Sequence, residues 1–441
     1  MEQIPYRFAE QVSKSILWAR SNKKNRAIAI GLLVFIVIAI ETFSWLAPTP
    51  KIHSCGPSIE FLRFFHVQML CDSYWYMMDA QNPRRLLFGG TSIDAENTLL
   101  QDRPGISITA LLISKLIIII PGFNKKISYG GVDGSTVNYN LNTFAAYIFI
   151  NLIVLMIGLY LIVKIFQNNY NSPFANYKST ILYVSGFLII MSMNQITKIF
   201  FWIPNSGIFN TFIPVYMVWL IKRKDDFTKP KFQVSQSIFT AIGTLMYPMF
   251  LVCIPLIIIL SFGKRRILGL VTSAIAFLPY LVWPVIIKVL GGNTLYHGAK
   301  NYDQFTWIIK SAKEGILVKS VLDNFTLYMS SFSVTPLVGI FCCFAILIRN
   351  NGKSGYLNFL MAMIARRKYE FFAIAFYFLW LFLIGMYDTR WSWGPTFLLL
   401  LVAGEAMHKR NFKISNSVIT IWVGIVILNL VSWVGTPMPW S

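Results

Sequence analysis

The chain has 441 residues, of which 56% are hydrophobic and only 13% are charged, and its mean hydropathy is +0.58. A soluble domain carries roughly 25% charged residues, so this composition excludes an ordinary soluble protein. The net charge of +21 does not indicate nucleic-acid binding, because the Lys and Arg residues stand in short clusters beside apolar runs, where anionic lipid headgroups are the expected counter-charge.

Apolar runs long enough to cross a hydrocarbon core of ~30 Å recur along the whole chain. They are continuous rather than alternating, which favours membrane helices over a β-barrel. The sequence therefore predicts an all-α, polytopic integral membrane protein, with about 10 to 12 membrane helices by the hydropathy and charge rules.

Residues 1–25 are basic, with apolar residues at helical spacing. This pattern predicts a cytoplasmic amphipathic segment lying on the membrane surface, with a frayed basic tail as the alternative. Residues 27–46 form an apolar run too long for a signal peptide and without its cleavage site, so we expect a retained first helix. The basic residues before it place the N-terminus in the cytoplasm, and residues 26–441 then form one transmembrane domain.

By this count residues 48–104 form a large external loop, which contains six of the 18 acidic residues. Within it, the segment 58–70 (SIEFLRFFHVQML) has a helical amphipathic period and is predicted to lie along the membrane surface. Cys55 and Cys71 share this loop and would form a disulfide if the loop faces an oxidising compartment.

The middle of the chain does not satisfy the same count. Three apolar segments, 106–121, 141–165 and 180–193, lie between the first loop and FFWIPNSG (residues 200–207). If FFWIPNSG is external, an odd number of crossings does not fit the charge pattern. We therefore expect that one of the three segments does not cross fully, and the sequence leaves open which one.

The later half alternates regularly between basic turns and apolar runs. Residues 235–262 are interrupted at Tyr247-Pro248 and have bases at both ends, which predicts two short helices bent into a hairpin. Residues 291–325 are expected to form a second external loop. Further crossings are predicted over residues 267–290, 326–348, 370–387, 394–408 and 416–435.

Polar side chains collect on the external side in this topology. A carboxylate can take a proton from an attacking hydroxyl, and arginine can hold a phosphate and offset its charge as it leaves. Acids and arginines beside lipid therefore indicate a reaction on a phosphate-bearing lipid. The candidates are Asp72, Asp79, Gln101 to Gly105, Asn205, His297, Asp303, Asp388 and Arg390.

Each candidate also has a simpler interpretation. Asp72 is solvated if its loop is open, and Arg103 is an interfacial anchor if it only reaches the headgroups. Arg390 is more specific, because a base in a short external turn opposes the positive-inside rule. The tryptophans at 391, 393 and 440 are expected to be an interfacial belt. No C-x-x-C or H-x-x-x-H spacing predicts a metal site.

Three short motifs follow one another along the chain. Asp72, Tyr76 and Ala80 form a D-x-x-x-Y-x-x-x-A pattern in the first loop, and Arg103-Pro104 precedes the next apolar run. A late turn then combines an arginine with aromatic residues ahead of a proline. The residues of this turn are Tyr387, Arg390, Trp391 and Pro395.

In these motifs and their sidedness the chain resembles the GT-C glycosyltransferases, polytopic membrane enzymes that take a sugar from a polyprenyl-phosphate carrier at the external face. The break at Tyr247-Pro248 resembles the short helix pair of such enzymes. The resemblance spans most of the chain, but a second acidic motif is missing and Asn205 stands in its place. No soluble domain follows the last predicted helix, as one does in several subfamilies.

The resemblance implies that Asp72 is the catalytic base or acceptor-orienting acid, and that Arg390 and Arg103 contact the carrier phosphate. The sugar would pass with inversion to a lipid, glycan or protein acceptor. The other expected substrate-binding residues are Asp79, Tyr76, Tyr387, Asp303 and His297.

Two alternatives remain open, a lipid-linked glycan polymerase or ligase and a transporter or flippase of lipid-linked sugars. Expected partners are membrane lipids, the polyprenyl-phosphate sugar and its acceptor, with no nucleic acid. No cofactor is expected apart from the donor, and a need for a divalent metal is left open. The abundance of Ile, Asn and Lys indicates an AT-rich bacterial genome, hence an inner-membrane protein with a periplasmic or extracellular active site.

Overall fold

The computed structural model is predominantly helical, with two short β-hairpins among the residues it describes. The described residues are 31–32, 34–42, 58–61, 65–68, 71–88, 103–130, 136–167, 177–262, 266–291, 306–332, 367–385, 387, 389–409 and 416–435. The predicted surface segment 1–25 lies outside them. So do Cys55 and the side chain of Cys71, so the described residues do not include the predicted disulfide.

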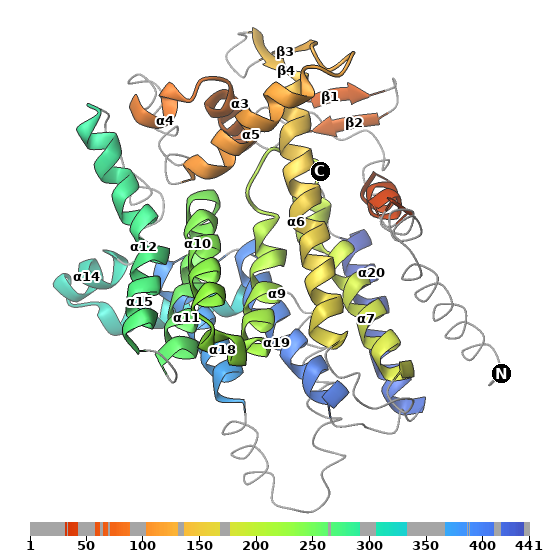
Figure 1. The fold of residues 1–441 in the computed structure, drawn as a ribbon, viewed down its shortest axis with the longest axis vertical. Coiled ribbons are helices and arrows are strands. Elements are labelled where there is room, and N and C mark those ends of the chain that lie inside the picture. The colour runs from red at the N-terminus through yellow and green to blue at the C-terminus, as the bar shows by residue number, and fades with distance from the viewer. Residues whose placement is uncertain are drawn as a thin grey trace, which may run out of the picture.

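One end of the molecule is covered by short elements that we call the cap (Figure 1). Two antiparallel hairpins and three helices gather there, while the longer helices run away from it (Figure 1). The cap consists of β1 (Ser58–Phe61), β2 (Phe65–Gln68), α3 (Cys71–Gln81), α4 (Arg84–Phe88), α5 (Pro104–Ile117), β3 (Lys126–Gly130) and β4 (Thr136–Asn140).

The hairpin β1–β2 corrects the predicted amphipathic helix over 58–70. Its register pairs Ile59 with Val67 and Phe61 with Phe65. The same apolar residues that gave a helical period also alternate within each strand, so apolar residues face apolar residues across the ladder. A short apolar run fits both a helical and a strand period, and in this segment the pairing of β1 with β2 selects the strand.

Helix α5 covers the first of the three apolar segments and is the shortest of the three helices there. Its 14 residues span only about 21 Å at the α-helical rise, and it lies in the cap beside α3 and α4 (Figure 1). By contrast, α6 (Leu141–Gln167) has 27 residues, or about 40 Å. That one of the three segments does not cross fully stays a prediction, and its length makes α5 the candidate.

The other helices form the body of the molecule. The apolar segments predicted over 141–165, 180–193, 267–290 and 416–435 are confirmed as helices. The body comprises α6, α7 (Tyr177–Ser192), α8 (Gln195–Phe200), α9 (Phe209–Lys222), α10 (Pro230–Met246), α11 (Cys253–Phe262), α12 (Arg266–Val289), α14 (Thr306–Lys313), α15 (Leu317–Ser330), α18 (Lys368–Ile384), α19 (Thr389–Lys409) and α20 (Asn416–Gly435), with short 3-10 helices η2 (Lys224–Thr228) and η3 (Pro248–Val252).

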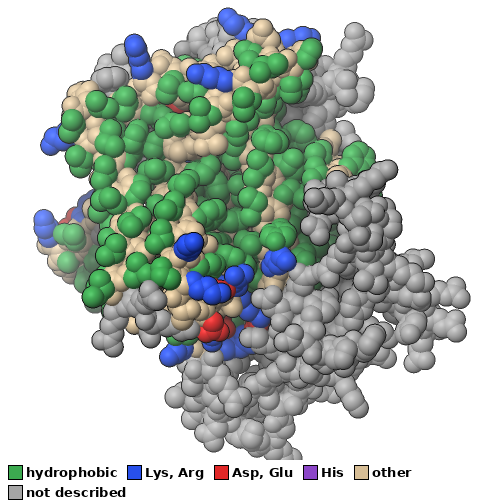
Figure 2. Space-filling model, in the orientation of Figure 1, with side chains coloured by type: hydrophobic (Ala, Val, Ile, Leu, Met, Phe, Trp, Pro, Cys, Tyr) green, Lys and Arg blue, Asp and Glu red, His purple; other side chains and the backbone are tan. Residues whose placement is uncertain are grey.

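Two helices of the described part are long and apolar enough to cross a membrane, over Leu141–Phe166 and Ile267–Val289. The surface agrees with this apolar character. In the face that Figure 2 shows, hydrophobic side chains cover the middle, and Lys and Arg side chains lie toward the upper and lower edges. Shorter apolar helices cover Pro104–Ile117, Phe209–Lys222, Pro248–Phe262 and Trp422–Val434.

The predicted bent hairpin is confirmed. Helix α10 ends at an extended Tyr247, because the residue before a proline is disfavoured in the α conformation. The chain then returns through η3 and α11. A Cβ on Gly269 of α12 would touch both Gln233, near the start of α10, and Ser261, near the end of α11. Both ends of the hairpin therefore meet at one level.

The late turn is shorter than predicted. Helix α19 begins at Thr389, so Arg390 and Trp391 belong to its first turn rather than to a loop. Nor are Trp391 and Trp393 part of an exposed interfacial belt, because Trp393 is only 3% exposed and Trp391 packs against the core. Trp440 lies outside the described residues. The second predicted loop is also partly helical, since α14 and the start of α15 lie within it.

Candidate functional site

The candidate site centres on Arg103, which stands immediately before α5. Its Nη1 donates to the hydroxyl oxygens of Tyr76 (2.7 Å) and Ser206 (3.0 Å). These two hydroxyls also bond to each other at 2.8 Å. Tyr76 and Ser206 are fully buried, whereas Arg103 is only partly buried. The two hydroxyls therefore hold Nη1 of the guanidinium group from the buried side.

An aromatic wall extends the site from Arg103 to α19. The Arg103 guanidinium carbon lies 5.5 Å from the centroid of the Tyr247 ring, a cation–π distance. Tyr247 in turn stacks on Trp391, with centroids 5.6 Å apart and planes 8° from parallel. Its hydroxyl donates to Asn210 Oδ1 at 3.0 Å. The break at Tyr247 thus brings the start of α5 and the start of α19 together.

Tyr76 is anchored on its other side by α6. The hydroxyl of Tyr147 donates to the Tyr76 carbonyl at 2.7 Å and also lies 3.2 Å from Ser107 Oγ. The two tyrosine rings meet edge to face with centroids 5.9 Å apart. These contacts tie α3, α5 and α6 at one point, so the position of Arg103 is set by three helices.

Ser206 comes from an irregular segment, residues 201–208, between α8 and α9. Asn151 of α6 holds this segment, since its Nδ2 donates to the carbonyls of Phe200 (2.9 Å), Phe201 (3.0 Å) and Ile203 (3.1 Å). Non-helical backbone inside an apolar body needs such partners. Asn205, noted in the sequence, is buried and accepts from the Gly207 backbone N–H at 2.7 Å.

Asp79 lies two turns beyond Asp72 on α3 and is 4% exposed. Its carboxylate is 3.5 Å from Arg85 Nε, whose guanidinium also lies 5.8 Å from the Trp75 ring. Burial raises the pKa of Asp79 from 3.8 to about 7, although Arg85 acts in the opposite direction. A carboxyl group in this environment can exchange a proton near neutral pH.

The other predicted site residues divide into two groups. Asp72 lies one turn before Tyr76 on α3, and Arg390 directly precedes Trp391 on α19. The side chains of Asp72 and Arg390 lie outside the described part, and His297 and Asp303 lie outside it entirely. Tyr387 donates to the Phe382 carbonyl at 2.9 Å, and burial raises its pKa to about 12.

The sequence missed one member of the site, Ser206, and noted another, Trp391, in the late-turn motif without its contact with Tyr247. Ser206 had no signal beyond its place in FFWIPNSG, because a serine in a polar loop is ordinary. Trp391 was assigned to an interfacial belt. Trp391 follows Arg390 in the chain, but its contact with Tyr247 could be recognised only by knowing that these two segments meet.

Within the described ranges no group of three or more His, Cys, Asp and Glu side chains could hold a metal ion. No family model, curated protein or solved structure matches this chain. The function is therefore argued from the site itself.

Proposed function

We propose that the protein is a membrane glycosyltransferase that moves a sugar from a polyprenyl-phosphate donor to a hydroxyl acceptor. The observation that carries this proposal is the convergence of distant motifs on Arg103. Tyr76 of the first-loop motif binds it, Tyr247 at the helix break packs against it, and Trp391 beside Arg390 stacks on Tyr247. Those motifs carry the resemblance to the GT-C family.

Arg103 is the proposed contact for the donor phosphate. Its two described hydrogen bonds on Nη1 go to hydroxyl groups, which orient the guanidinium. An oriented guanidinium can bind phosphate oxygens at fixed angles. The same interaction strengthens as charge develops on the departing polyprenyl phosphate.

The start of α19 would supply the second phosphate contact. This helix has 21 residues, and the N–H groups of a helix N-terminus favour an anion. Arg390 is its second residue, and Trp391 reaches Tyr247. A phosphate bound between Arg103 and this terminus would have cationic groups from two sides.

An acid on α3 would complete the reaction. The acceptor oxygen would attack the anomeric carbon, the bond from that carbon to the phosphate oxygen would break, and the hydroxyl proton would pass to a carboxylate. Asp72 is the first choice, since it lies one helical turn before Tyr76 on α3. Asp79, with its pKa near 7, is the second.

The membrane setting of this proposal is supported by the long apolar helices and by the exposed apolar side chains of the body. Ile267 and Val289, at the two ends of α12, are 80% and 79% exposed, which favours contact with lipid over water. We propose several membrane crossings, a bacterial inner-membrane location and an external cap, so that a lipid-linked donor reaches Arg103 from the bilayer.

The test is transfer of radiolabelled sugar from a panel of polyprenyl-phosphate sugars in membranes, with Asp72→Asn and Asp79→Asn compared with the wild type at matched expression. Loss of transfer in Asp72→Asn with donor binding retained supports the assigned base. Equal transfer in Asp72→Asn and the wild type moves that role to Asp79. Transfer from no donor removes the glycosyltransferase proposal and favours a polymerase or a flippase, to be tested with lipid-linked oligosaccharides and a flipping assay.

A further inference from the structure

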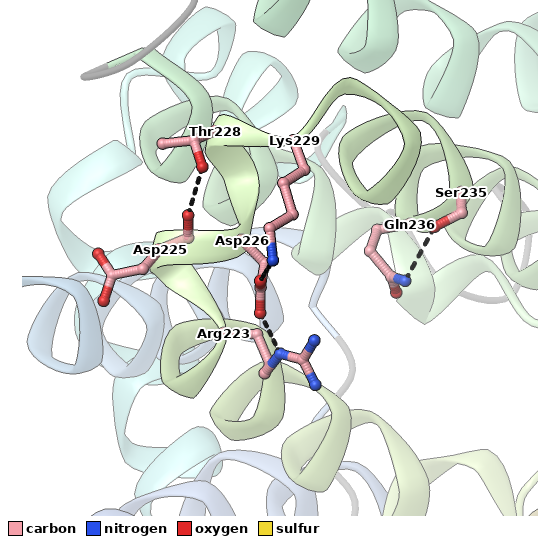
Figure 3. Close-up of polar contacts among 7 residues, drawn as sticks. All are labelled: Arg223, Asp225, Asp226, Thr228, Lys229, Ser235 and Gln236. Carbon is pink, nitrogen blue, oxygen red and sulfur yellow. Dashed lines mark hydrogen bonds and ion pairs between the residues drawn. The ribbon is translucent and has the colours of Figure 1, made fainter.

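The end of the body opposite the cap carries a group of charged side chains around η2 and the start of α18, and most of its cations have carboxylate partners. Asp226 lies between Arg223 and Lys229 (Figure 3). The Lys229 hydrogen bond, at 2.7 Å, and the contact with Arg223 hold the pKa of Asp226 below its usual 3.8. These two cations therefore share one carboxylate partner.

A second, buried set of ion pairs joins three helices at the same end. Glu405 of α19 is 3% exposed and binds Lys222 of α9 and Arg367 beside α18, the latter at 2.6 Å. Arg367 also lies 3.7 Å from Glu370.

Lys224 and Lys368 differ from these paired cations. Both are exposed, and no carboxylate of the described chain forms an ion pair with either. Instead both ammonium groups lie over one aromatic ring, that of Tyr369, at 5.8 Å and 5.3 Å from its centroid. The ring attracts both cations, so two exposed positive charges lie around one ring, where they attract an anion.

An aromatic ladder leads away from this pair along α18. Phe372, Phe376 and Trp380 follow at four-residue spacing, and successive centroids are 5.9 Å apart in both steps. Each ring is only partly buried. The ladder therefore offers a continuous apolar strip that begins one turn after Lys368 and runs along α18.

We propose that Lys224, Lys368 and Tyr369 bind the phosphate of an anionic glycerophospholipid, with one acyl chain along Phe372 and Phe376. Paired cations beside an apolar strip match a charged headgroup joined to a hydrocarbon tail. This site shares with the proposed function only the membrane setting, and lipid binding in detergent needs no sugar transfer. Failure of one proposal therefore leaves the other standing.

The test uses the purified full chain in detergent, stripped of lipid and titrated with phosphatidylglycerol or phosphatidylcholine, with bound lipid counted by native mass spectrometry. The double variant Lys224→Gln/Lys368→Gln should bind phosphatidylglycerol about tenfold more weakly or worse, as expected for two lysines near a headgroup. Phosphatidylcholine binding should not change. The matched control, Lys125→Gln/Lys126→Gln, removes the same charge from exposed lysines of the cap.

Three results would overturn the proposal. The first is wild-type affinity for phosphatidylglycerol in the Lys224/Lys368 variant, and the second is an equal loss in the cap control, which would indicate general charge attraction. The third is displacement of the lipid by an equal concentration of inorganic phosphate, which would identify a free-anion site. In addition, Phe376→Ala should weaken binding of long-chain but not of dihexanoyl phosphatidylglycerol, and equal effects on both would remove the acyl-chain contact.

Discussion

Replacing Asn151 by leucine should destabilise the protein strongly, because this side chain supports backbone that has few other partners. The carbonyls of Phe201 and Ile203 accept no other backbone hydrogen bond in the described chain. An amide NH2 has two hydrogens, so its three contacts of 2.9 to 3.1 Å amount to about two full bonds.

The expected loss follows from these counts. A net hydrogen bond contributes about 1 kcal/mol, and each buried carbonyl left without a donor costs about 1 to 3 kcal/mol. Two carbonyls lose their donor, so Asn151→Leu should lower the free energy of unfolding by about 2 to 6 kcal/mol. Asn142 is also buried but donates once, to the Ser114 carbonyl at 3.1 Å. That carbonyl also accepts from the Ile118 backbone N–H, so the same substitution there should cost only the net hydrogen bond, about 1 kcal/mol.

Equilibrium unfolding in mixed detergent micelles would measure both variants. The comparison cancels the extra volume of leucine, which both sites must accept. Hydrogen bonds between membrane helices average only about 0.6 kcal/mol in double-mutant cycles, so the test is the difference between the two variants rather than either value alone. If Asn151→Leu costs no more than Asn142→Leu, the irregular segment is held by packing rather than by Asn151, and our account of how Ser206 is positioned is wrong.

Three further changes test the packing and charge of the cap. Gly105→Ala should cost about 1 to 3 kcal/mol, since its Cβ would lie 3.0 Å from the Leu245 backbone, whereas Gly424→Ala, with nothing within 4 Å, should be nearly neutral by unfolding. Because the pKa of Asp79 is raised from 3.8 to about 7, the unfolded chain loses this proton first. The stability that protonated Asp79 contributes is then fully present below pH 4 and is lost as the pH rises toward 7, by at most about 4 kcal/mol. The free energy of unfolding of Asp79→Asn should therefore lack this dependence on pH. If the variant keeps the dependence, another group causes it. Tyr76→Phe keeps the buried ring but removes bonds to Ser206 and Arg103, so it should cost about 2 to 3 kcal/mol and be coupled to Ser206→Ala in a double-mutant cycle; strict additivity would contradict the shared network.

Local sequence signals predicted much of the fold. Apolar length gave α6 and α12, and Pro248 gave the break after α10, because these features depend on residues close together in the chain. The hairpin at β1–β2 was not predicted, since its apolar run fits both a helical and a strand period and only pairing selects one.

The site was predicted in part for a similar reason. Tyr76, Arg103 and the break at Tyr247 stood out as motifs, but nothing local joins Tyr76 to Ser206, 130 residues away. The role of Trp391 also depends on a long-range contact, its stacking on Tyr247. A tryptophan near the end of an apolar run is typical of a membrane interface, and that general rule concealed a packed residue.

The most direct test of the central claim is donor binding and transfer in Arg103→Gln, compared with Arg84→Gln. Arg84 is an exposed arginine of the same cap, so both variants lose one charge. The account predicts that, for the donor that the wild type uses, Arg103→Gln loses at least tenfold in polyprenyl-phosphate-sugar binding or transfer, as removal of a charge-assisted phosphate contact implies, while Arg84→Gln keeps both. Equal activity in the two variants would show that the donor phosphate is not recognised at Arg103, and the proposed site would be wrong.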